Sequence, residues 1–487
     1  MPPAAREMPY DSEKNSERKK LVKLSGGQTL NMTTGDPRGM ILRFAVPVFL
    51  SQLFQQLYNT VDTLAVGHMI SNDAMGAVSA TGSLIFLLVS FFTGASMGVG
   101  VVISRYFGAG NYEKLSRAIH TGVILGLISG VLLTVVGVAF TPAILSWMVK
   151  DATVRPIAVQ YFRYYFFGVS AVVMYNLFTG IMNAVGDSRR PLYYLLLSSV
   201  LNVILDIVFI LLYRAAGVTD ETVLVRAPAL ATVVSQAVSM VLCLIHLLKK
   251  GTVYRIRFRD LRIDREMLFE IARFGLPTGI QNSVIGLANV MVQSNISSFG
   301  NLAMAGCGAY SKIEGFVFLP ITSFALALTT FIGQNLGARQ YDRAGYGARF
   351  GIVVSVIMAE IIGVAVFLLA EPLMRIFVDA GDPNAAAIIE IGVRQCRTEA
   401  LFFFLLAFSH CIAGICRGAG KAFVPMLIML LIWCVFRIIY IEVAMSIRHE
   451  ILLLFIAYPL TWAISSAIYL IYYKKSDWIH GFDKKKA

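Results

Sequence analysis

The feature that most constrains this chain is its series of long apolar runs, each about as long as a membrane is thick. Residues 123–140, 193–212 and 351–369 are three of these runs. A helix of roughly 18–20 residues, at about 1.5 Å per residue, spans the roughly 30 Å hydrocarbon core of a bilayer. Only 15% of the 487 residues are charged and 57% are hydrophobic, whereas a soluble protein carries about a quarter charged residues. We therefore expect an integral membrane protein built of many helices.

The apolar runs predict twelve membrane-spanning helices. Their expected limits are 40–63, 80–104, 118–140, 158–182, 191–213, 227–248, 271–296, 312–334, 348–369, 392–415, 424–446 and 449–473. Four prolines fall in or near the first turns of these spans, where a missing N–H costs least: Pro47, Pro191, Pro277 and Pro425. Pro320 and Pro459 lie deeper in their spans and predict kinks.

Positive charge is distributed unequally between the two sides of the expected membrane. With the N-terminus inside, 31 of the 42 Lys and Arg residues fall on the cytoplasmic side, eight of them in residues 249–273. This pattern predicts a multi-pass plasma-membrane protein with both termini in the cytoplasm. Residues 1–36 contain no signal peptide and predict a disordered cytoplasmic tail. The net charge of +13 is then explained by the orientation of the protein in the membrane and by its contact with anionic lipid. We therefore expect no nucleic-acid partner.

One long unit occurs twice in this chain, in the same order. Residues 105–118 (RYFGAGNYEKLSRA) return about 229 positions later as QNLGARQYDRAGYG, and the motifs at 44–47 and 180–186 return at offsets of 230 and 234. Six spans per unit give both units the same orientation, so a pseudo-two-fold axis along the membrane normal should relate them. The sequence thus predicts an all-α membrane protein of two six-helix lobes, which is typical of a transporter. The expected divisions are a tail at 1–36, an N-lobe at 37–250, a basic cytoplasmic linker at 251–270, a C-lobe at 271–475 and a cytoplasmic tail at 476–487.

Several motifs together resemble those of the multidrug and toxic compound extrusion (MATE) transporters. They are the LYNTVDTLAVG core within 47–67, FGAGNYEK, GIMNAVGDSRRP, the NVILDIVFI run at 202–210, and the second-half counterparts GLPTGIQN, GQNLGARQYDRA and GICRGAGKAFVP. The likeness covers residues 37–475 and is closest to the bacterial DinF-like branch, whose carboxylates lie in the N-lobe. It implies a V-shaped pair of lobes that open alternately to each side of the membrane. It also implies export of amphipathic, often cationic, small molecules driven by inward flow of Na⁺ or H⁺, with no cofactor, and we expect a monomer.

Two carboxylates within the first-half spans are the best candidates for coupling export to a cation. Asp62 closes a stripe with Gln52, Gln55 and Asn59, whose spacings of 3, 4 and 3 place all four on one helix face. Asp206 lies in the fifth span, about 22 Å from its start, and Asp62 lies about 27 Å from Phe44, so both reach a similar depth. A charge at the bilayer centre costs roughly 2.5–3.5 kcal/mol and is therefore usually functional. The pair could hold Na⁺ or share a proton.

The resemblance adds specific roles for residues near these carboxylates. Asp62, Asn202 and Asp206 match the cation-site positions of the N-lobe, where Na⁺ would bind, and Thr232 in the sixth span is a fourth match. Tyr58 and Asn59 are supporting polar residues that could equally serve only as hydrogen-bonding groups between helices. Asn176 and Asn183 in the fourth span are weaker candidates for the substrate cavity.

The second repeat keeps the scaffold but loses both carboxylates, because Val292 and Tyr440 stand at the positions of Asp62 and Asp206. The cation chemistry is therefore assigned to the first lobe. The second lobe carries other charges within its spans, namely Glu360, Glu399 and Arg437. We expect Arg437 to form a structural ion pair with Glu360 or Glu399; the alternative is a contribution to substrate or cation binding.

Three other kinds of function are alternatives to multidrug export. A lipid-linked precursor flippase of the same superfamily would need a cationic central cavity, whereas only Arg437 stands clearly within a span. A membrane-embedded transferase would need clustered His or Asp residues near a membrane face, which the sequence lacks, so we do not expect an enzyme. A passive channel is compatible with a duplicated six-span unit. The Gly-rich loops lack the spacing of a nucleotide-binding loop, which argues against ATP-driven export.

Overall fold

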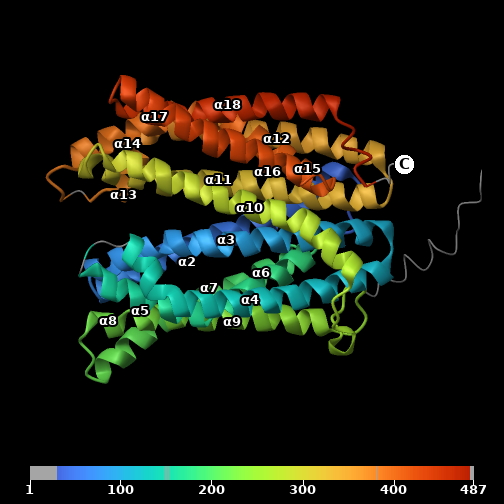
Figure 1. Cartoon of the computed structure of the whole chain (residues 1–487), viewed down its shortest axis with the longest axis horizontal. Coiled ribbons are helices and arrows are strands. Elements are labelled where there is room, and N and C mark those ends of the chain that lie inside the picture. Colours follow the sequence, from blue (N-terminus) through green and yellow to red (C-terminus); the bar gives the residue numbers. More distant parts are fainter. Residues whose placement is uncertain (1–29, 149–150, 152, 380, 483–487) are drawn as a thin grey trace, which may run out of the picture.

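The computed structural model describes residues 30–148, 151, 153–379 and 381–482 (Figure 1). Within these residues every regular element is a helix. In the first half they are α2 (Pro37–Met69), α3 (Asn72–Ala109), α4 (Tyr112–Met148), α5 (Val154–Phe167), α6 (Val169–Ala184), α7 (Arg189–Ala215), α8 (Glu221–Leu224) and α9 (Arg226–Leu248). After the short η1 (Phe258–Asp260), the second half contains α10 (Arg265–Ser297), α11 (Asn301–Gly337), α12 (Tyr341–Leu368), α13 (Ala370–Phe377), α14 (Ala385–Glu399), η2 (Ala400–Phe402), α15 (Phe403–Gly418), α16 (Phe423–Ile428), η3 (Met429–Phe436), α17 (Arg437–Ile447) and α18 (Ile451–Lys475).

Each of the twelve expected spans corresponds to a helix or to a broken pair of helices. Among the described residues, ten segments are long and apolar enough to cross a membrane, and α5 with α6 forms an eleventh that bends by 50°. The twelfth, α10, is 33 residues long and is less apolar than these segments, with Gly, Asn, Gln and Ser residues along most of its length. The corresponding first helix of the other repeat, α2, has the lowest hydropathy of the ten. The first helix of each repeat is thus its most polar span.

Two of the four prolines expected near helix starts lie well inside their helices. α2 begins at Pro37 and α10 at Arg265, so Pro47 and Pro277 are interior residues. The apolar run marks only the part of each helix in contact with hydrocarbon, and α2 begins three residues and α10 six residues before the expected span. Pro191 and Pro425 do lie in first turns, and Pro320 and Pro459 are interior, as expected.

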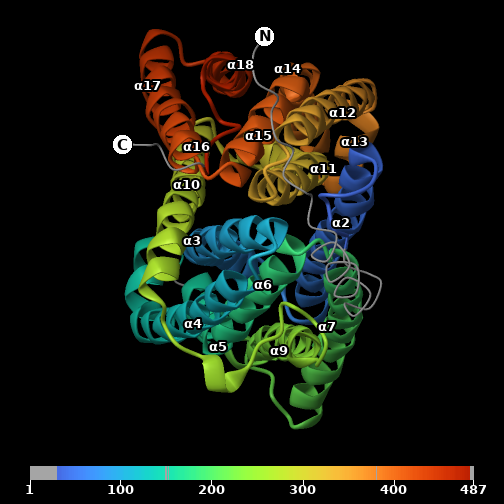
Figure 2. The same cartoon turned by 90° about the vertical axis from the view of Figure 1, so that its right-hand side faces the viewer.

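The helices form two bundles, and the first helix of each repeat reaches across to the other bundle. Figure 2 shows α2 on one side of the molecule and α10 on the opposite side, each running between the two bundles. α2 packs against α7 of its own half and α11 of the other, whereas α10 packs chiefly against α3. This exchange of equivalent helices is the arrangement expected for two repeats related by a pseudo-two-fold axis.

The contact between α3 and α10 depends on two pairs of facing glycines. A Cβ atom built on Gly98 would lie 2.4 Å from the Cα of Gly275, and one on Gly94 would lie 2.6 Å from the Cα of Gly279. On each helix the glycines are four residues apart, so they share a face. Small residues at this spacing let helix backbones approach closely within a membrane.

Part of the expected N-terminal tail is folded against the bundles. Residues 30–36, which we call the N-terminal strap, lie beside α11 and α12, and Met32 is fully buried. The Arg343 guanidinium donates hydrogen bonds to the carbonyl oxygens of Met32, Thr34 and Gly35. The prediction of a disordered tail is therefore wrong for the strap, because a buried methionine and these hydrogen bonds anchor it. Residues 1–29 of that prediction lie outside the described residues.

Candidate functional site

The two candidate carboxylates lie side by side within the first bundle. Asp62 comes from α2 and Asp206 from α7, and their side-chain carboxyl groups are near enough to interact electrostatically. Only 6% of Asp62 and 1% of Asp206 is exposed. The polar face of α2 thus brings its one carboxylate into the packing between α2 and α7.

Helix α9 completes this group of buried polar residues. The Asn202 amide donates a hydrogen bond to Thr232 Oγ1 at 3.4 Å. Thr232, the fourth residue expected at the cation site, therefore lies next to the α7 residues of that site. Gln236, one turn beyond Thr232 on α9, donates to the Tyr58 hydroxyl at 3.0 Å. Gln236 was not among the site residues predicted from the sequence, although its spacing of four residues from Thr232 places the two on one helix face. We call Tyr58, Asp62, Asn202, Asp206, Thr232 and Gln236 the carboxylate cluster.

The carboxylate cluster contains oxygen atoms that no hydrogen-bond donor satisfies. Within the described part of the chain, the atoms without a partner are Asp62 Oδ1, Asn202 Oδ1, both carboxylate oxygens of Asp206 and Gln236 Oε1. Buried polar atoms are normally hydrogen-bonded, so a concentration of unsatisfied acceptors indicates a place for a positive charge. Carboxylate and amide oxygens are the ligands of hard cations, and two adjacent carboxyl groups can instead share a proton.

The remaining polar candidates do not join this cluster. Gln52, Gln55, Asn176 and Asn183 line a cavity of about 220 Å³ between the two bundles, which we call the central chamber. Its walls come from α2, α3, α6 and α7 on one side and from α11 and α15 on the other. Thr322 and Ser323 of α11 both donate hydrogen bonds to Gln52 Oε1, so the stripe on α2 links the two halves.

Two further observations refine the residues around the central chamber. Asn59 is exposed and does not line it. Arg417, near the end of α15, does line it although it is only 6% exposed, and its Nε has no hydrogen-bond partner among the described residues. Arg417 lies two residues beyond the expected tenth span, 392–415, because α15 continues to Gly418.

The sequence profile of one transporter family, MatE, matches residues 47–208 and 277–442. These two matches cover most of both repeats. The chain belongs to the MatE family.

Curated relatives of this MatE protein align over nearly its whole length. It is 28% identical over 442 residues to the probable multidrug resistance protein YoeA of Bacillus subtilis, covering 88% of this chain and 92% of the relative. It is 27% identical over 397 residues to the probable multidrug resistance protein NorM of Thermotoga maritima, covering 81% and 83%. The resemblance to MATE transporters found in the sequence is confirmed.

Solved structures of the same kind establish the fold. A MOP superfamily transporter from Pyrococcus furiosus matches with a TM-score of 0.83 at 21% identity, over 91% of this chain and 96% of that one. A multidrug resistance MATE family transporter in an outward-facing conformation matches with a TM-score of 0.82 at 22% identity, over 96% and 99%. The expected architecture of twelve helices in two lobes is therefore confirmed.

The charges of the second half do not form the expected ion pair. Glu399 is fully buried and accepts hydrogen bonds from the Tyr310 hydroxyl and the Gln395 amide. The Arg437 guanidinium donates instead to Thr461 Oγ1 at 2.8 Å and lies over the Tyr458 ring.

The pairing prediction fails because of the local helix geometry. Among the described residues no carboxylate oxygen lies within 4.0 Å of Arg437, so an ion pair with Glu360 or Glu399 is absent. Arg437 follows the π-helical segment η3, whose i→i+5 hydrogen bonds change the direction in which later side chains point. Glu360 is half-buried, and its Oε2 has no partner in the described structure.

Close contacts join the two halves at the end of the molecule that carries the N-terminal strap, residues 249–264 and Phe482. We call this the basic end. Gln334 of α11 donates a hydrogen bond to the Ala184 carbonyl at 2.8 Å and accepts one from the Met32 N–H at 3.0 Å. A Cβ on Gly108 would lie 1.9 Å from the Gln334 carbonyl oxygen. The central chamber is therefore closed toward the basic end.

Proposed function

We propose that this protein is a secondary active multidrug exporter that exchanges small organic molecules for H⁺ or Na⁺. Its membership of the MatE family and the names of its relatives support export of multiple compounds. The observation that supports a coupling site here is the group of oxygen atoms around Asp62 and Asp206 that have no hydrogen-bond donor. The presence of these carboxylates in the first half favours the DinF-like branch.

The coupling mechanism follows from the cost of an uncompensated buried charge. A proton or Na⁺ at Asp62 and Asp206 would neutralise the carboxylate cluster and stabilise the packing of α2 against α7 and α9. Gln52 and Gln55 of α2 line the central chamber, so a shift of α2 alters the chamber walls. The cation therefore favours one position of α2 and the substrate favours another. Binding of one then opposes binding of the other, which is the requirement for antiport.

The orientation and the substrate class belong to the same proposal. We place the basic end in the cytoplasm of a plasma-membrane protein, because its Lys and Arg residues satisfy the positive-inside rule. Closure of the chamber at that end then separates it from the cytoplasm. The substrates are amphipathic, often cationic, small molecules carried by a monomer without a nucleic-acid partner. Arg417 is the single charged residue among the chamber's described lining residues. A lipid-linked precursor flippase would need a cationic central cavity, so the chamber supports that function less well than multidrug export.

Transport by proteoliposomes containing the Asp206→Asn variant tests the coupling site. The amide has nearly the same shape but cannot be protonated or supply a negative charge, so we expect export of ethidium driven by an imposed cation gradient to fall to background. Wild-type transport by Asp206→Asn would contradict the assignment. Asp220→Asn is the matched control, because Asp220 is an exposed N-cap of α8 and asparagine caps helices equally well.

The same proteoliposomes identify the coupling ion and exclude a channel. An outwardly directed Na⁺ gradient and an outwardly directed proton gradient are imposed separately on vesicles that contain the wild-type protein. An antiporter accumulates ethidium against its own gradient under one or both conditions, whereas a channel only equilibrates it. Equilibration without accumulation in both cases would contradict the proposed exporter.

A further inference from the structure

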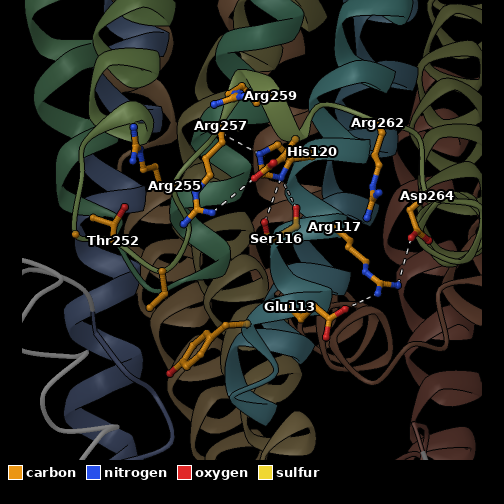
Figure 3. A pocket seen from close by; sticks show the side chains of 14 residues that line it. Glu113, Ser116, Arg117, His120, Thr252, Arg255, Arg257, Arg259, Arg262 and Asp264 are labelled. Atoms are coloured by element: carbon orange, nitrogen blue, oxygen red, sulfur yellow. Dashed lines mark hydrogen bonds and ion pairs between the residues drawn. The ribbon is translucent and has the colours of Figure 1, made fainter.

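A second cavity lies at the basic end, away from the carboxylate cluster and the central chamber. It has a volume of about 750 Å³ and lies between the first two turns of α4 and the segment that joins α9 to α10. Figure 3 shows arginine side chains around it from both elements. We call it the arginine pocket; its charged lining residues are Glu113, Arg117, Arg255, Arg257, Arg259, Asp260, Arg262 and Asp264.

The three carboxylates of the arginine pocket are all paired. Arg117 of α4 forms ion pairs with Glu113 and Asp264. Arg257 lies 3.7 Å from Asp260. These pairs account for two of the five arginines and leave the other three without a neutralising partner.

The unpaired arginines are Arg255, Arg259 and Arg262. Within the described residues none of them has a carboxylate oxygen within 4.0 Å. The Nε of Arg255 donates to the Leu248 carbonyl, which fixes the base of the side chain and leaves its two terminal nitrogens for a ligand. Three guanidinium groups around one cavity favour a ligand with several anionic oxygens, because guanidinium binds phosphate with two parallel hydrogen bonds.

The backbone that carries these arginines is held in place before any ligand binds. His120 of α4 is buried, and its Nε2 accepts a hydrogen bond from the Arg257 N–H at 2.9 Å. The Asp264 N–H donates to Thr121 Oγ1 at 3.1 Å. Tyr254 is also buried beside His246, and burial raises the pKa of its phenol to about 12, so it stays protonated. A fixed backbone lowers the entropic cost of binding.

The arginine pocket lies at the outer limit of the headgroup region of a bilayer, within reach of an arginine side chain. Exposed apolar side chains on α4 begin at Leu127, seven residues after His120, which is a rise of about 10 Å. The polar region on each side of the hydrocarbon core is about 5–8 Å thick, so His120 lies just outside it, and the long arginine side chains around the pocket can extend into it. Phe258, Ile263 and Phe269 lie close by in the sequence and are 63%, 46% and 71% exposed. Exposed apolar groups beside unpaired arginines suit a membrane surface rather than a soluble ligand alone.

We propose that the arginine pocket binds the phosphate of an anionic phospholipid in the cytoplasmic leaflet. Basic pockets on the cytoplasmic side of membrane proteins suit such headgroups. The bound phosphate would join α4 of the first half to the segment that leads into α10, and so would brace the connection between the two repeats. The proposal uses the orientation given above, but its test does not require transport.

Native mass spectrometry of the purified full-length protein tests this site. The protein is prepared with phosphatidylglycerol or with zwitterionic phosphatidylcholine, and the lipid retained on each molecule is counted. We expect wild-type protein to retain phosphatidylglycerol selectively. Replacing Arg255, Arg259 and Arg262 by Gln should lower this retention about fivefold for each arginine, or on the order of 100-fold together. The control variant Lys474→Gln/Lys475→Gln removes two exposed charges at the same end, on α18, and should retain the lipid.

Two further measurements keep the outcome decisive. Arg259→Glu alters one exposed side chain that can be changed without disturbing packing, and it should reduce retention even if the triple variant fails to fold. Pyrophosphate added to lipid-free protein in detergent distinguishes a soluble ligand from a lipid. Stabilisation by pyrophosphate without selective retention of phosphatidylglycerol would overturn the lipid assignment. Retention unchanged in Arg259→Glu and in the triple variant would overturn the site itself.

Discussion

At the scale of single residues, the Gln236 amide holds the Tyr58 hydroxyl beside the two carboxylates. Gln236→Leu keeps much of the side-chain volume but removes this hydrogen bond. Leaving a buried hydroxyl without its partner costs about 1–3 kcal/mol, so we expect the cation concentration for half-maximal transport to rise on the order of 10-fold or more. Titrating transport with the coupling cation measures this change.

Ser239→Ala is the matched control for that prediction. Ser239 lies on the same helix, one turn beyond Ser235, but its hydroxyl donates to the Tyr194 carbonyl outside the carboxylate cluster. Its variant should retain the wild-type cation dependence. An unchanged cation dependence in Gln236→Leu would show that the α9 side of the cluster does not contribute to coupling.

Residue periodicity predicted the position of the carboxylate cluster better than its full membership. The sequence predicted that Asp62 and Asp206 lie close together, because the depth of each residue in the membrane and the helix face that carries it both follow from a regular helical rise. Gln236 was missed although it is one turn from Thr232, because a lone amide within an apolar run gives a weaker signal than a carboxylate. The pairing of Arg437 could not be predicted, because the π-helix before it breaks that regular rise.

At the scale of helices, the glycine pairs hold α3 and α10 in close contact along their length. Gly98→Leu would place a Cβ 2.4 Å from the Gly275 Cα, and neither backbone can move without separating the helices. Overpacking of this kind costs about 1–3 kcal/mol or more. We expect a lower midpoint of thermal unfolding in detergent and reduced transport.

Gly82 on the same helix supplies the control for Gly98. It is exposed, and a Cβ there would meet no atom within 4 Å, so Gly82→Leu should unfold at the wild-type temperature. Equal stability of the two variants would show that α3 and α10 separate without cost.

Helix existence was predictable from the apolar runs, but helix ends were not. The eighth span was expected to start at residue 312, whereas α11 begins at Asn301. Hydropathy records only where a helix meets hydrocarbon, and the polar turns beyond it are stabilised by capping and by contacts with other helices. Glu314, two residues after the expected start of that span, therefore lies more than three turns inside α11.

At the scale of the whole molecule, the duplicated sequence predicted two related bundles but not how they are joined. The exchange of α2 and α10 between bundles arises from contacts far apart in the chain, which local patterns do not encode. The strap was missed for the same reason, because the backbone of Met32 is hydrogen-bonded to Gln334 and Asn335, 302 and 303 positions later in the sequence. Such contacts concentrate at the basic end, where the two halves must separate if the central chamber is to open there.

Gln334 is the residue through which this closure is best tested. Its side chain links the strap to α11 and α11 to the end of α6, through hydrogen bonds with Met32 and Ala184. Gln334→Ala removes both bonds, and at about 0.5–1.5 kcal/mol each the open population should rise on the order of 10-fold. Spin labels at Arg189→Cys on α7 and Asp342→Cys on α12, both exposed positions, measure the separation of the two halves.

The distance distribution between these labels gives a direct readout of closure. Wild-type protein should show mainly the short distance, and Gln334→Ala should show a larger population at a longer one. Gln340→Ala is the control, because its Oε1 has no hydrogen-bond partner among the described residues and the change removes no bond between the halves. Should Gln334→Ala and Gln340→Ala give the same distribution as the wild type, the glycine contacts beside Gln334 rather than its side chain would hold the basic end closed.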